Sequence, residues 1–335
     1  MICKPNFLQE TVGYFSNSNL AFVQTPQTFY NLDVFQYNVS KKFNNEQDFF
    51  MRYIEPARDS RKGVLHIGTN AIFRRKYVEE VGLYPTKSIT EDMALGLLLQ
   101  AKGYDSIFIN KSLVQGLSVT TYPELIKQRD RWCRGNLQVL KNYKNVIFKK
   151  LKFDQKMIYL DGILYWFTGL IKLIFIITPI VYLLSGITIV NLPPKFLFPL
   201  FFVAFCSQII LSKCILPKKI SSKYFSFFMK GEFYNTTLAP HLTRSVFRHY
   251  FLSDMKFNVT NKNCSNKKGH YYFKLALPHL LMLIFSIFSI IVGTLKLKKG
   301  LYLDSYLINV FWVCYNIPGL LVALKIAYHP PRNNI

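Results

Sequence analysis

The sequence is poor in acidic residues. Among its 335 residues, 18 Asp and Glu stand against 42 Lys and Arg, which gives a formal net charge of +24. A nucleic-acid-binding domain often carries such a charge, but not together with 30 phenylalanines and long apolar runs. Half of the residues are hydrophobic, and this content combined with the high net charge fits neither a disordered chain nor an ordinary soluble domain. The composition therefore indicates a membrane protein with no nucleic-acid partner.

Cysteine is scarce as well, and its spacing carries no signal. The six cysteines form no Cys-x-x-Cys pair or other ligand spacing, which excludes a disulfide framework and a zinc site. We expect no metal ligands in the chain. The segment Met1–Phe7 has no basic region followed by an apolar one, so no signal peptide is predicted.

The acids that are present lie mostly in the first half. Residues 1–158 hold 23 basic and 14 acidic residues, whereas the remainder holds 19 and 4. We therefore expect an α/β domain in the cytosol, followed by an α-helical polytopic membrane region with about four transmembrane helices. Each helix needs about 20 residues to cross a hydrocarbon core of about 30 Å. The apolar stretches of that length are 163–188, 196–216, 275–295 and 306–327.

The loop between the second and third stretches is strongly basic. Residues 213–274 carry 12 Lys and Arg and only two acids, so the positive-inside rule places this loop in the cytosol. Its aromatic and basic part, Tyr224–Phe251, predicts a helix in the headgroup region. The polar run Asn258–Gly269 predicts a mobile loop.

The first half shows alternating strand and helix patterns. The expected strands are Leu20–Gln24 and Ser106–Asn110, and the expected helices are Lys76–Val81, Glu91–Lys102 and Pro123–Leu140.

The first chemical candidate is the acidic pair that opens the helix expected from residue 91. Acids in a first turn ordinarily complement the helix dipole, and Thr90 or Ser88 would cap that helix. The alternative is functional: Asp92, beside Glu91, is held at the helix end as a general base.

The second candidate lies on the following helix. Gln128, Arg131 and Trp132 fall within about one turn of each other. Basic residues beside Trp ahead of a membrane span are ordinarily an interfacial anchor. The alternative is a site for an anionic, sugar-bearing ligand, because arginine neutralises phosphate and an indole face accepts a pyranose ring.

Three further patches are ordinary loops when taken alone, and only their order in the chain gives them meaning. They are Gln24-Thr25-Pro-Gln, Gly68-Thr69-Asn-Ala and Phe257-x-Val259-Thr260-x-Lys262. Together with Thr-Glu-Asp and Gln-x-x-Arg-Trp, and with membrane spans before the last patch, the ordered set resembles the bacterial cellulose synthases, which are processive family 2 glycosyltransferases. The resemblance covers nearly the whole chain, from about residue 4 to about residue 328.

The resemblance implies a role for each matching position. Asp92 matches the general base that deprotonates the 4-hydroxyl of the growing glucan, and Glu91 and Thr90 shape its surroundings. The acceptor end and the pyrophosphate of UDP are implied to bind at the positions Gln24, Thr25, Gly68, Thr69, Gln128, Arg131 and Trp132.

The resemblance also implies a gating loop that closes over the nucleotide sugar. Its residues would be Phe257, Val259, Thr260 and Lys262, and Lys262 would contact the diphosphate. The polar composition of this segment agrees with a moving lid.

Some parts of the family pattern are absent from this sequence. The family has an Asp that holds uridine and an Asp-x-Asp that binds Mg2+ or another divalent metal on the diphosphate, and neither matches here. The cofactor is therefore expected for the full enzyme, with ligands outside this chain. A cyclic-di-GMP-binding domain is also absent. We expect a partial synthase that works with a missing amino-terminal half and accessory export subunits.

The fold expected from the resemblance is a partial family 2 glycosyltransferase domain followed by the membrane region. Its parts are a carboxy-terminal piece of the cytosolic domain, an interfacial helix region, two transmembrane helices, a cytosolic segment with the gating loop, and two more transmembrane helices. Their boundaries are 1–120, 121–158, 159–216, 217–274 and 275–328.

The expected function is β-1,4-glucan polymerisation from UDP-glucose by inverting transfer, coupled to export, in the bacterial cytoplasmic membrane. One alternative is another membrane polysaccharide synthase, with a hyaluronan-like or chitin-like product. A second is a non-catalytic channel or remnant, because Lys172, Gln208 and Asn316 in the expected spans could line a polar path. Lys172 would otherwise lie in the interface or snorkel to it.

Overall fold

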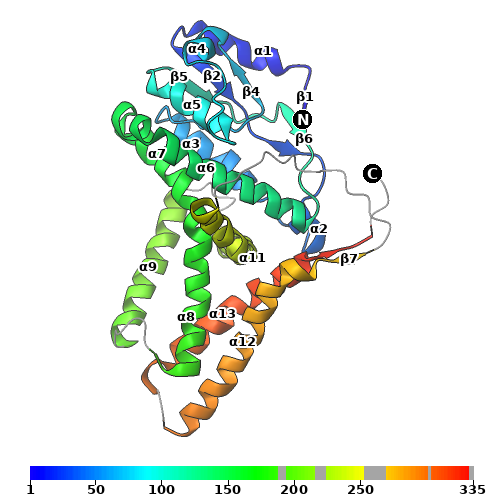
Figure 1. The fold of residues 1–335 in the computed structure, drawn as a ribbon, viewed down its shortest axis with the longest axis vertical. Helices are drawn as coiled ribbons and strands as arrows, with labels where there is room; N and C mark the ends of the chain where they lie inside the picture. The colour runs from blue at the N-terminus through cyan, green and yellow to red at the C-terminus, as the bar shows by residue number, and fades with distance from the viewer. Residues whose placement is uncertain (188–193, 216–223, 253–268, 301–302, 332–335) are drawn as a thin grey trace. The chain divides into compact units, whose positions relative to one another are not determined.

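The computed structural model describes residues 1–187, 194–215, 224–252, 269–300 and 303–331 (Figure 1). Contacts between residues divide the chain into two compact units. The first is built from Met1–Phe167 and Arg244–Ser265, and the second from Thr168–Thr243 and Asn266–Asn333. Helix α11 (Tyr224–Phe251) contributes to both units.

The first unit contains two small sheets. In one, β2 (Leu20–Gln24) lies between antiparallel β4 (Ala71–Phe73) and parallel β5 (Asp105–Phe108). All five residues of β2 are buried, as expected of a strand covered on both faces. In the other sheet, β6 (Val114–Gly116) is the central strand. It pairs antiparallel with β1 (Ile2–Cys3) and parallel with β3 (Thr28–Phe29).

Helices surround these sheets. They are α1 (Phe7–Thr11), α2 (Val34–Asn38), α3 (Glu55–Asp59), α4 (Arg75–Glu80), α5 (Glu91–Ala101), α6 (Tyr122–Lys150), α7 (Phe153–Leu164), the 3₁₀ turns η1 (Val12–Ser16) and η3 (Tyr165–Phe167), and the π-helical turn η2 (Phe50–Ile54). Leu95 and Leu99 of α5 pack against Phe22 of β2 and Phe108 of β5. This packing fixes α5 against the sheet, which places the start of the helix beside the loops that follow the strands.

The expected elements of this unit are present. The strand Leu20–Gln24 is confirmed, and the strand expected at 106–110 is β5, shifted by one or two residues. The helices expected at 76–81 and 91–102 are α4 and α5. The helix expected at Pro123–Leu140 is longer than expected: α6 continues to Lys150 past a break in the helical geometry at Tyr143.

The second unit is helical. It contains α8 (Thr168–Ser185), α9 (Pro194–Ile215), the first part of α11, α12 (Phe273–Lys298) and α13 (Leu303–Ile326), and the short strands β7 (His270–Tyr271) and β8 (Tyr328–His329) pair antiparallel. Helices α8, α12 and α13 pack together around Ile176, Ile180, Leu183 and Val313. Their outward faces carry exposed isoleucines and phenylalanines, which suits contact with lipid.

Helices lie at all four of the expected membrane stretches, but the apolar part of one of them is shorter than that of the others. Within the described ranges, three helices are long and apolar enough to cross a membrane: Phe153–Ser185, Phe273–Lys298 and Ser305–Ile326. At the second expected stretch, α9 carries a shorter apolar segment, Phe202–Leu211. The described residues therefore contain three candidate spans where about four were expected, and the second expected span corresponds to the shorter apolar helix.

The Lys172 side chain does not extend to the surface of the second unit, as a snorkelling lysine would. Its side chain is buried inside the second unit, where Nζ donates to Glu232 Oε2 at 2.7 Å and to Asn316 Oδ1 at 2.9 Å. The ammonium also lies 5.5 Å from the centre of the Tyr315 ring. The charge is paired between three helices, as expected of an ionisable group among apolar helices.

Candidate active site

The candidate site lies in the first unit, where the loop before β4 meets the start of α5. Gly68 in this loop has φ +80°, a conformation that favours glycine. A Cβ atom at this position would lie 2.5 Å from Asp92 Oδ2. Glycine therefore lets the backbone of the loop approach the Asp92 carboxylate directly.

The buried Gln24 side chain holds this loop in place. Its Nε2 donates to the carbonyl oxygens of Thr69 at 2.7 Å and Asn70 at 3.2 Å. Its Oε1 accepts from the backbone N–H of Ile67 at 3.3 Å and contacts His66 Nδ1 at 3.1 Å. Both the nitrogen and the oxygen of the amide are thus hydrogen-bonded to the loop. Gln24 therefore supports the site by positioning this loop.

Neighbouring polar side chains complete the attachment of the loop. Thr25 is buried, and its Oγ1 donates to the carbonyl oxygen of Asn70 at 3.1 Å. Gln27 Nε2 donates to Thr69 Oγ1 at 2.7 Å. The structure therefore brings the expected residues Gln24, Thr25, Gly68 and Thr69 together, and Gly68 joins them to Asp92.

Asp92 stands in the first turn of α5. Its Oδ1 accepts from the backbone N–H of Met93 at 2.8 Å. Burial is the main cause that raises the pKa of Asp92 to about 6. The Glu91 carboxylate raises this pKa further, whereas the Met93 hydrogen bond and the Arg131 charge lower it. An aspartate with this pKa is ionised at neutral pH and is a stronger base than an exposed one.

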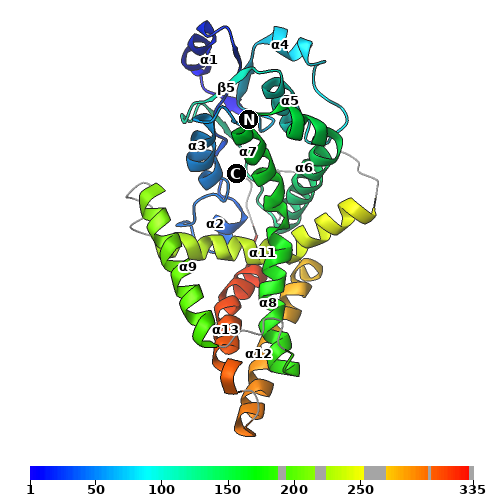
Figure 2. The same ribbon diagram turned by 90° about the vertical axis from the view of Figure 1, so that its left-hand side faces the viewer.

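Thr90 does not cap α5 with its side chain, contrary to that interpretation of the sequence. Its hydroxyl instead lies 3.2 Å from Ser88 Oγ, which donates to the carbonyl oxygen of Gly135 in α6 at 3.2 Å. A Cβ atom at Gly135 would lie 2.9 Å from Thr90 Oγ1. The close approach at Gly135 therefore packs the start of α5 against α6, and Figure 2 shows the two helices side by side.

The α6 residues expected in the site share one helical face. Gln128, Arg131 and Trp132 are separated by three and four residues along continuous helix. Gln128 is 7% exposed, and within the described part of the chain its Oε1 has no hydrogen-bond partner. Arg131 is near enough to Asp92 to lower its pKa. An acceptor oxygen and a cation thus stand on the helix that packs against the start of α5.

Trp132 is covered on one side by a neighbouring arginine. The Arg129 guanidinium lies 4.3 Å from the centre of the Trp132 ring, and Arg129 is also ion-paired with Glu46. The indole is therefore held in place by its own helix, as a stacking platform requires.

Two site residues escape the sequence interpretation. Tyr84 Oη lies 3.3 Å from His66 Nε2, and the pKa of Tyr84 is raised by burial and by the Asp92 and Glu91 charges. Burial lowers the pKa of His66 to about 3, so its ring is neutral. Because Gln24 Oε1 only accepts, His66 Nδ1 donates to it and Nε2 accepts from Tyr84. No motif marks Tyr84, and only its position near Asp92 reveals it.

The end of α11 within this unit is tied to α6. Arg248 Nη1 lies 3.4 Å from Asp130 Oδ2, and Arg134 Nη2 donates to the carbonyl oxygen of Leu252 at 3.5 Å. The expected gating-loop residues Phe257, Val259, Thr260 and Lys262 lie outside the described residues. The chain therefore leaves α11 beside the helix that bears Gln128, Arg131 and Trp132.

A divalent metal is expected only from the family resemblance. Among the described residues, no group of three or more His, Cys, Asp or Glu side chains could hold a metal ion. Asp92 and Glu91 alone do not fit such a site, because a divalent cation of this kind takes about six oxygen ligands.

Comparisons with known proteins identify the family of this chain. Residues 2–211 match the model of the family described as glycosyl transferase family group 2. The chain is 28% identical over 330 residues to the cellulose synthase catalytic subunit [UDP-forming] of Pseudomonas fluorescens (strain SBW25), covering 96% of this chain and 44% of the relative.

Other relatives share this pattern. Cellulose synthase 1 catalytic subunit [UDP-forming] of Komagataeibacter xylinus is 28% identical over 336 residues, covering 96% of this chain and 43% of the relative. The putative cellulose synthase 2 of the same bacterium is 26% identical, and the match covers 96% of this chain and 21% of the relative. The chain thus spans less than half the length of these relatives. Since the family match covers more than half of the chain, the protein belongs to glycosyl transferase family group 2.

Proposed function

We propose that this chain carries the acceptor side of a membrane-embedded, processive glycosyltransferase that polymerises β-1,4-glucan from UDP-glucose and exports it. The observation that carries the proposal is the Asp92 carboxylate, whose Oδ2 faces Gly68 with no intervening side chain. The similarity to cellulose synthase catalytic subunits along 96% of the chain supports the choice of substrate.

In the proposed reaction, Asp92 accepts the proton of the 4-hydroxyl at the end of the glucan. The freed oxygen attacks the anomeric carbon of the donor glucose as the bond between that carbon and the diphosphate breaks. UDP leaves with the bonding electron pair, and the configuration at the anomeric carbon inverts. A pKa of about 6 matches this task, because the base is ionised at neutral pH and still takes up a proton.

The α6 residues would position the two substrates. The Arg131 guanidinium would contact the diphosphate, because arginine forms charge-assisted hydrogen bonds with phosphate oxygens. The Trp132 indole, held by Arg129, would stack on the terminal sugar. The Gln128 oxygen, which has no partner within the described residues, would accept a hydrogen bond from a sugar hydroxyl.

The remaining parts of the proposal rest on the family resemblance. Phe257, Val259, Thr260 and Lys262 would form a lid over the nucleotide, and the attachment of Leu252 to α6 supports a start for that lid beside the acceptor site. An amino-terminal half would supply the divalent-metal and uridine ligands. Accessory subunits would assist export, and the site would face the cytosol at a bacterial inner membrane.

Asp92→Asn in the assembled synthase tests the proposal. The variant should lose about 10²- to 10⁴-fold in glucose incorporation from radiolabelled UDP-glucose, the usual contribution of a general base, while retaining UDP-glucose binding. Asp154→Asn is the matched control, since Asp154 is a first-turn acid of another helix. Unchanged incorporation by Asp92→Asn would contradict the proposal and favour a non-catalytic channel.

Donor choice tests the substrate separately. With UDP-glucose and UDP-N-acetylglucosamine in competition, we expect glucose to be incorporated. Preferential incorporation of N-acetylglucosamine would instead identify a chitin-like or hyaluronan-like synthase.

A further inference from the structure

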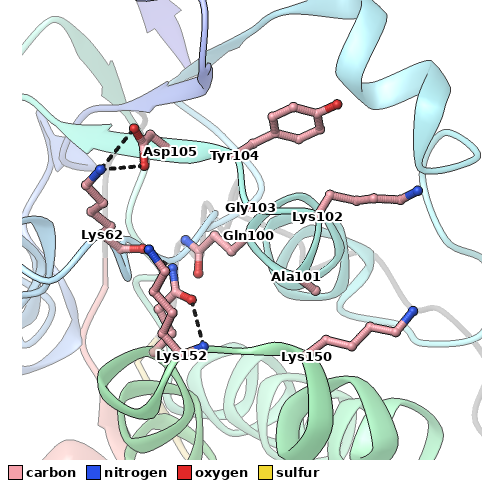
Figure 3. A pocket seen from close by; sticks show the side chains of 10 residues that line it. Lys62, Gln100, Ala101, Lys102, Gly103, Tyr104, Asp105, Lys150 and Lys152 are labelled. Carbon is pink, nitrogen blue, oxygen red and sulfur yellow. Dashed lines mark hydrogen bonds and ion pairs between the residues drawn. The ribbon is translucent and has the colours of Figure 1, made fainter.

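The first unit also contains a cavity of about 180 Å³ at the ends of α5 and α6. It is lined by the basic side chains of Lys62, Lys102, Lys150 and Lys152, together with Asp105 and Gln100. Figure 3 shows Lys62 and Asp105 on one side, Lys102 and Lys150 extending from two helix ends on the other, and Gln100 between them. A single water needs only about 10–15 Å³ of such space, so a larger molecule fits.

We propose that this cavity binds a phosphate ester that carries a hydroxyl group, such as a glycerol phosphate. The charge of the lining supports an anion. Lys62 is paired with Asp105 at 2.9 Å, whereas Lys102, Lys150 and Lys152 make no ion pair within the described ranges of the chain. The lining therefore carries three cations in excess of its acid, on flexible stems that can reorient towards a phosphate.

The floor of the cavity indicates a hydroxyl on the ligand. Gln100 is 3% exposed, and its Nε2 donates to the carbonyl oxygen of Val64 at 2.7 Å and to Ser106 Oγ at 3.0 Å. Its Oε1 has no hydrogen-bond partner among the described residues. Because a buried carbonyl oxygen is rarely left unpaired, a ligand hydroxyl that donates to Oε1 would complete the amide.

The backbone at Lys62 supports a functional role for its side chain. Lys62 has φ 53°, in the left-handed region where glycine is least strained. It closes the turn after α3 by donating from its backbone N–H to the carbonyl oxygen of Asp59 at 2.9 Å. A lysine in a glycine conformation at the wall of a basic cavity is the kind of strain that gathers at ligand sites. A lysine that only complements a helix dipole would not need this left-handed backbone conformation.

The cavity and Asp92 lie at opposite ends of α5. Asp92 is in the first turn and Lys102 follows the last residue, so ten residues separate them, about 15 Å along the axis. The ligand would therefore not compete with the acceptor. Two sources share its chemistry: a soluble phosphate ester, and the headgroup of phosphatidylglycerol, since Lys150 and Lys152 directly precede the apolar helix Phe153–Ser185.

The experiment is a titration of the full chain in phosphatidylcholine nanodiscs with sn-glycerol 3-phosphate, followed by calorimetry. A triple variant, Lys102→Gln with Lys150→Gln and Lys152→Gln, should bind about tenfold more weakly, because each exposed ion pair contributes a factor of a few. The control, Lys41→Gln with Lys76→Gln and Lys87→Gln, removes the same charge from exposed positions outside the cavity. It should bind like the parent.

Lys62→Gly keeps the proposal testable if the triple variant does not fold. Glycine suits φ 53° and should leave the melting temperature unchanged or raised, yet it unpairs Asp105 and should weaken binding several-fold. If the parent binds no soluble ester but retains phosphatidylglycerol during purification in a lysine-dependent manner, the lipid headgroup is the ligand. Neither kind of binding, or equal binding by the triple and control variants, would overturn the proposal.

Discussion

Two acids in the first unit, Glu55 in α3 and Asp92 in α5, both have a raised pKa but differ in what their carboxylate oxygens contact. Burial raises the pKa of Glu55 to about 7 and that of Asp92 to about 6. Glu55 is fully occupied: its Oε1 pairs with Arg58 Nη1 at 2.9 Å, and its Oε2 accepts from the Leu65 backbone N–H at 3.0 Å. Asp92 Oδ2 instead faces a glycine. A raised pKa therefore does not identify a base unless an oxygen remains accessible.

Arg58→Ala should have the largest effect on stability. Arg58 is buried between Glu55 and Asp161, and its loss would leave the Glu55 carboxylate buried and unpaired. We expect a loss of about 3–5 kcal/mol in the free energy of unfolding, measured by denaturation in detergent. Asp161→Asn is the control, since the Asp161 side chain is mostly exposed and its loss should cost little. Equal losses would show that Glu55 does not depend on Arg58.

Gly68→Ala should displace the carboxylate of the other acid, Asp92. The added methyl would lie 2.5 Å from Asp92 Oδ2, at a backbone position with φ +80°. A displaced base should lower glucose incorporation by about 100-fold. Gly82→Ala is matched to it, because Gly82 has φ +88° and no atom within 4 Å of an added Cβ. If both variants lose the same activity, backbone strain rather than access to Asp92 is responsible.

The pH dependence of stability should reveal Glu55. Because its pKa is raised on folding, the folded state binds the proton more tightly and stability falls as pH rises from about 4.5 to about 7. The fall is at most about 1.4 kcal/mol per pH unit. In Glu55→Gln it should be shallower over this window, as measured by urea unfolding at several pH values. An unchanged slope would show that Glu55 does not titrate there.

Tyr84→Phe should have the smallest effect. It removes the hydroxyl that donates to His66 Nε2 and that lies near Asp92. We expect a loss of only a few-fold in glucose incorporation, since the neutral His66 keeps its bond to Gln24 and the loop stays in place. A loss as large as that of Gly68→Ala would make Tyr84 a member of the catalytic machinery.

The sequence predicts local features of this chain well. The apolar run Leu20–Gln24 predicts the central strand, and the aromatic and basic stretch Tyr224–Phe251 predicts a helix that the structure contains with the same bounds. Both depend on residues close together in the chain. The ordered motifs also predict that Gly68 and Asp92 belong to one site, although no local pattern shows that glycine touches the carboxylate.

Features that depend on distant residues could not be predicted. Arg58 and Asp161 are hydrogen-bonded although they lie 103 positions apart in the sequence. Lys172 and Asn316 are hydrogen-bonded although they lie 144 positions apart. Tyr84 contacts His66, which lies 18 positions earlier in the chain. The two-residue strands β1 and β7 are too short to leave a periodic signal. In each case tertiary packing decides the contact.

The pH dependence of kcat/KM for glucose transfer by the assembled synthase tests the central claim, that Asp92 is the base. Because Asp92 must be ionised to accept a proton, the rate should fall tenfold per pH unit below about pH 6, and Glu55→Gln should leave this limb in place. A profile with no acid limb between about pH 5 and pH 7, or one whose limb disappears in Glu55→Gln, would contradict the account.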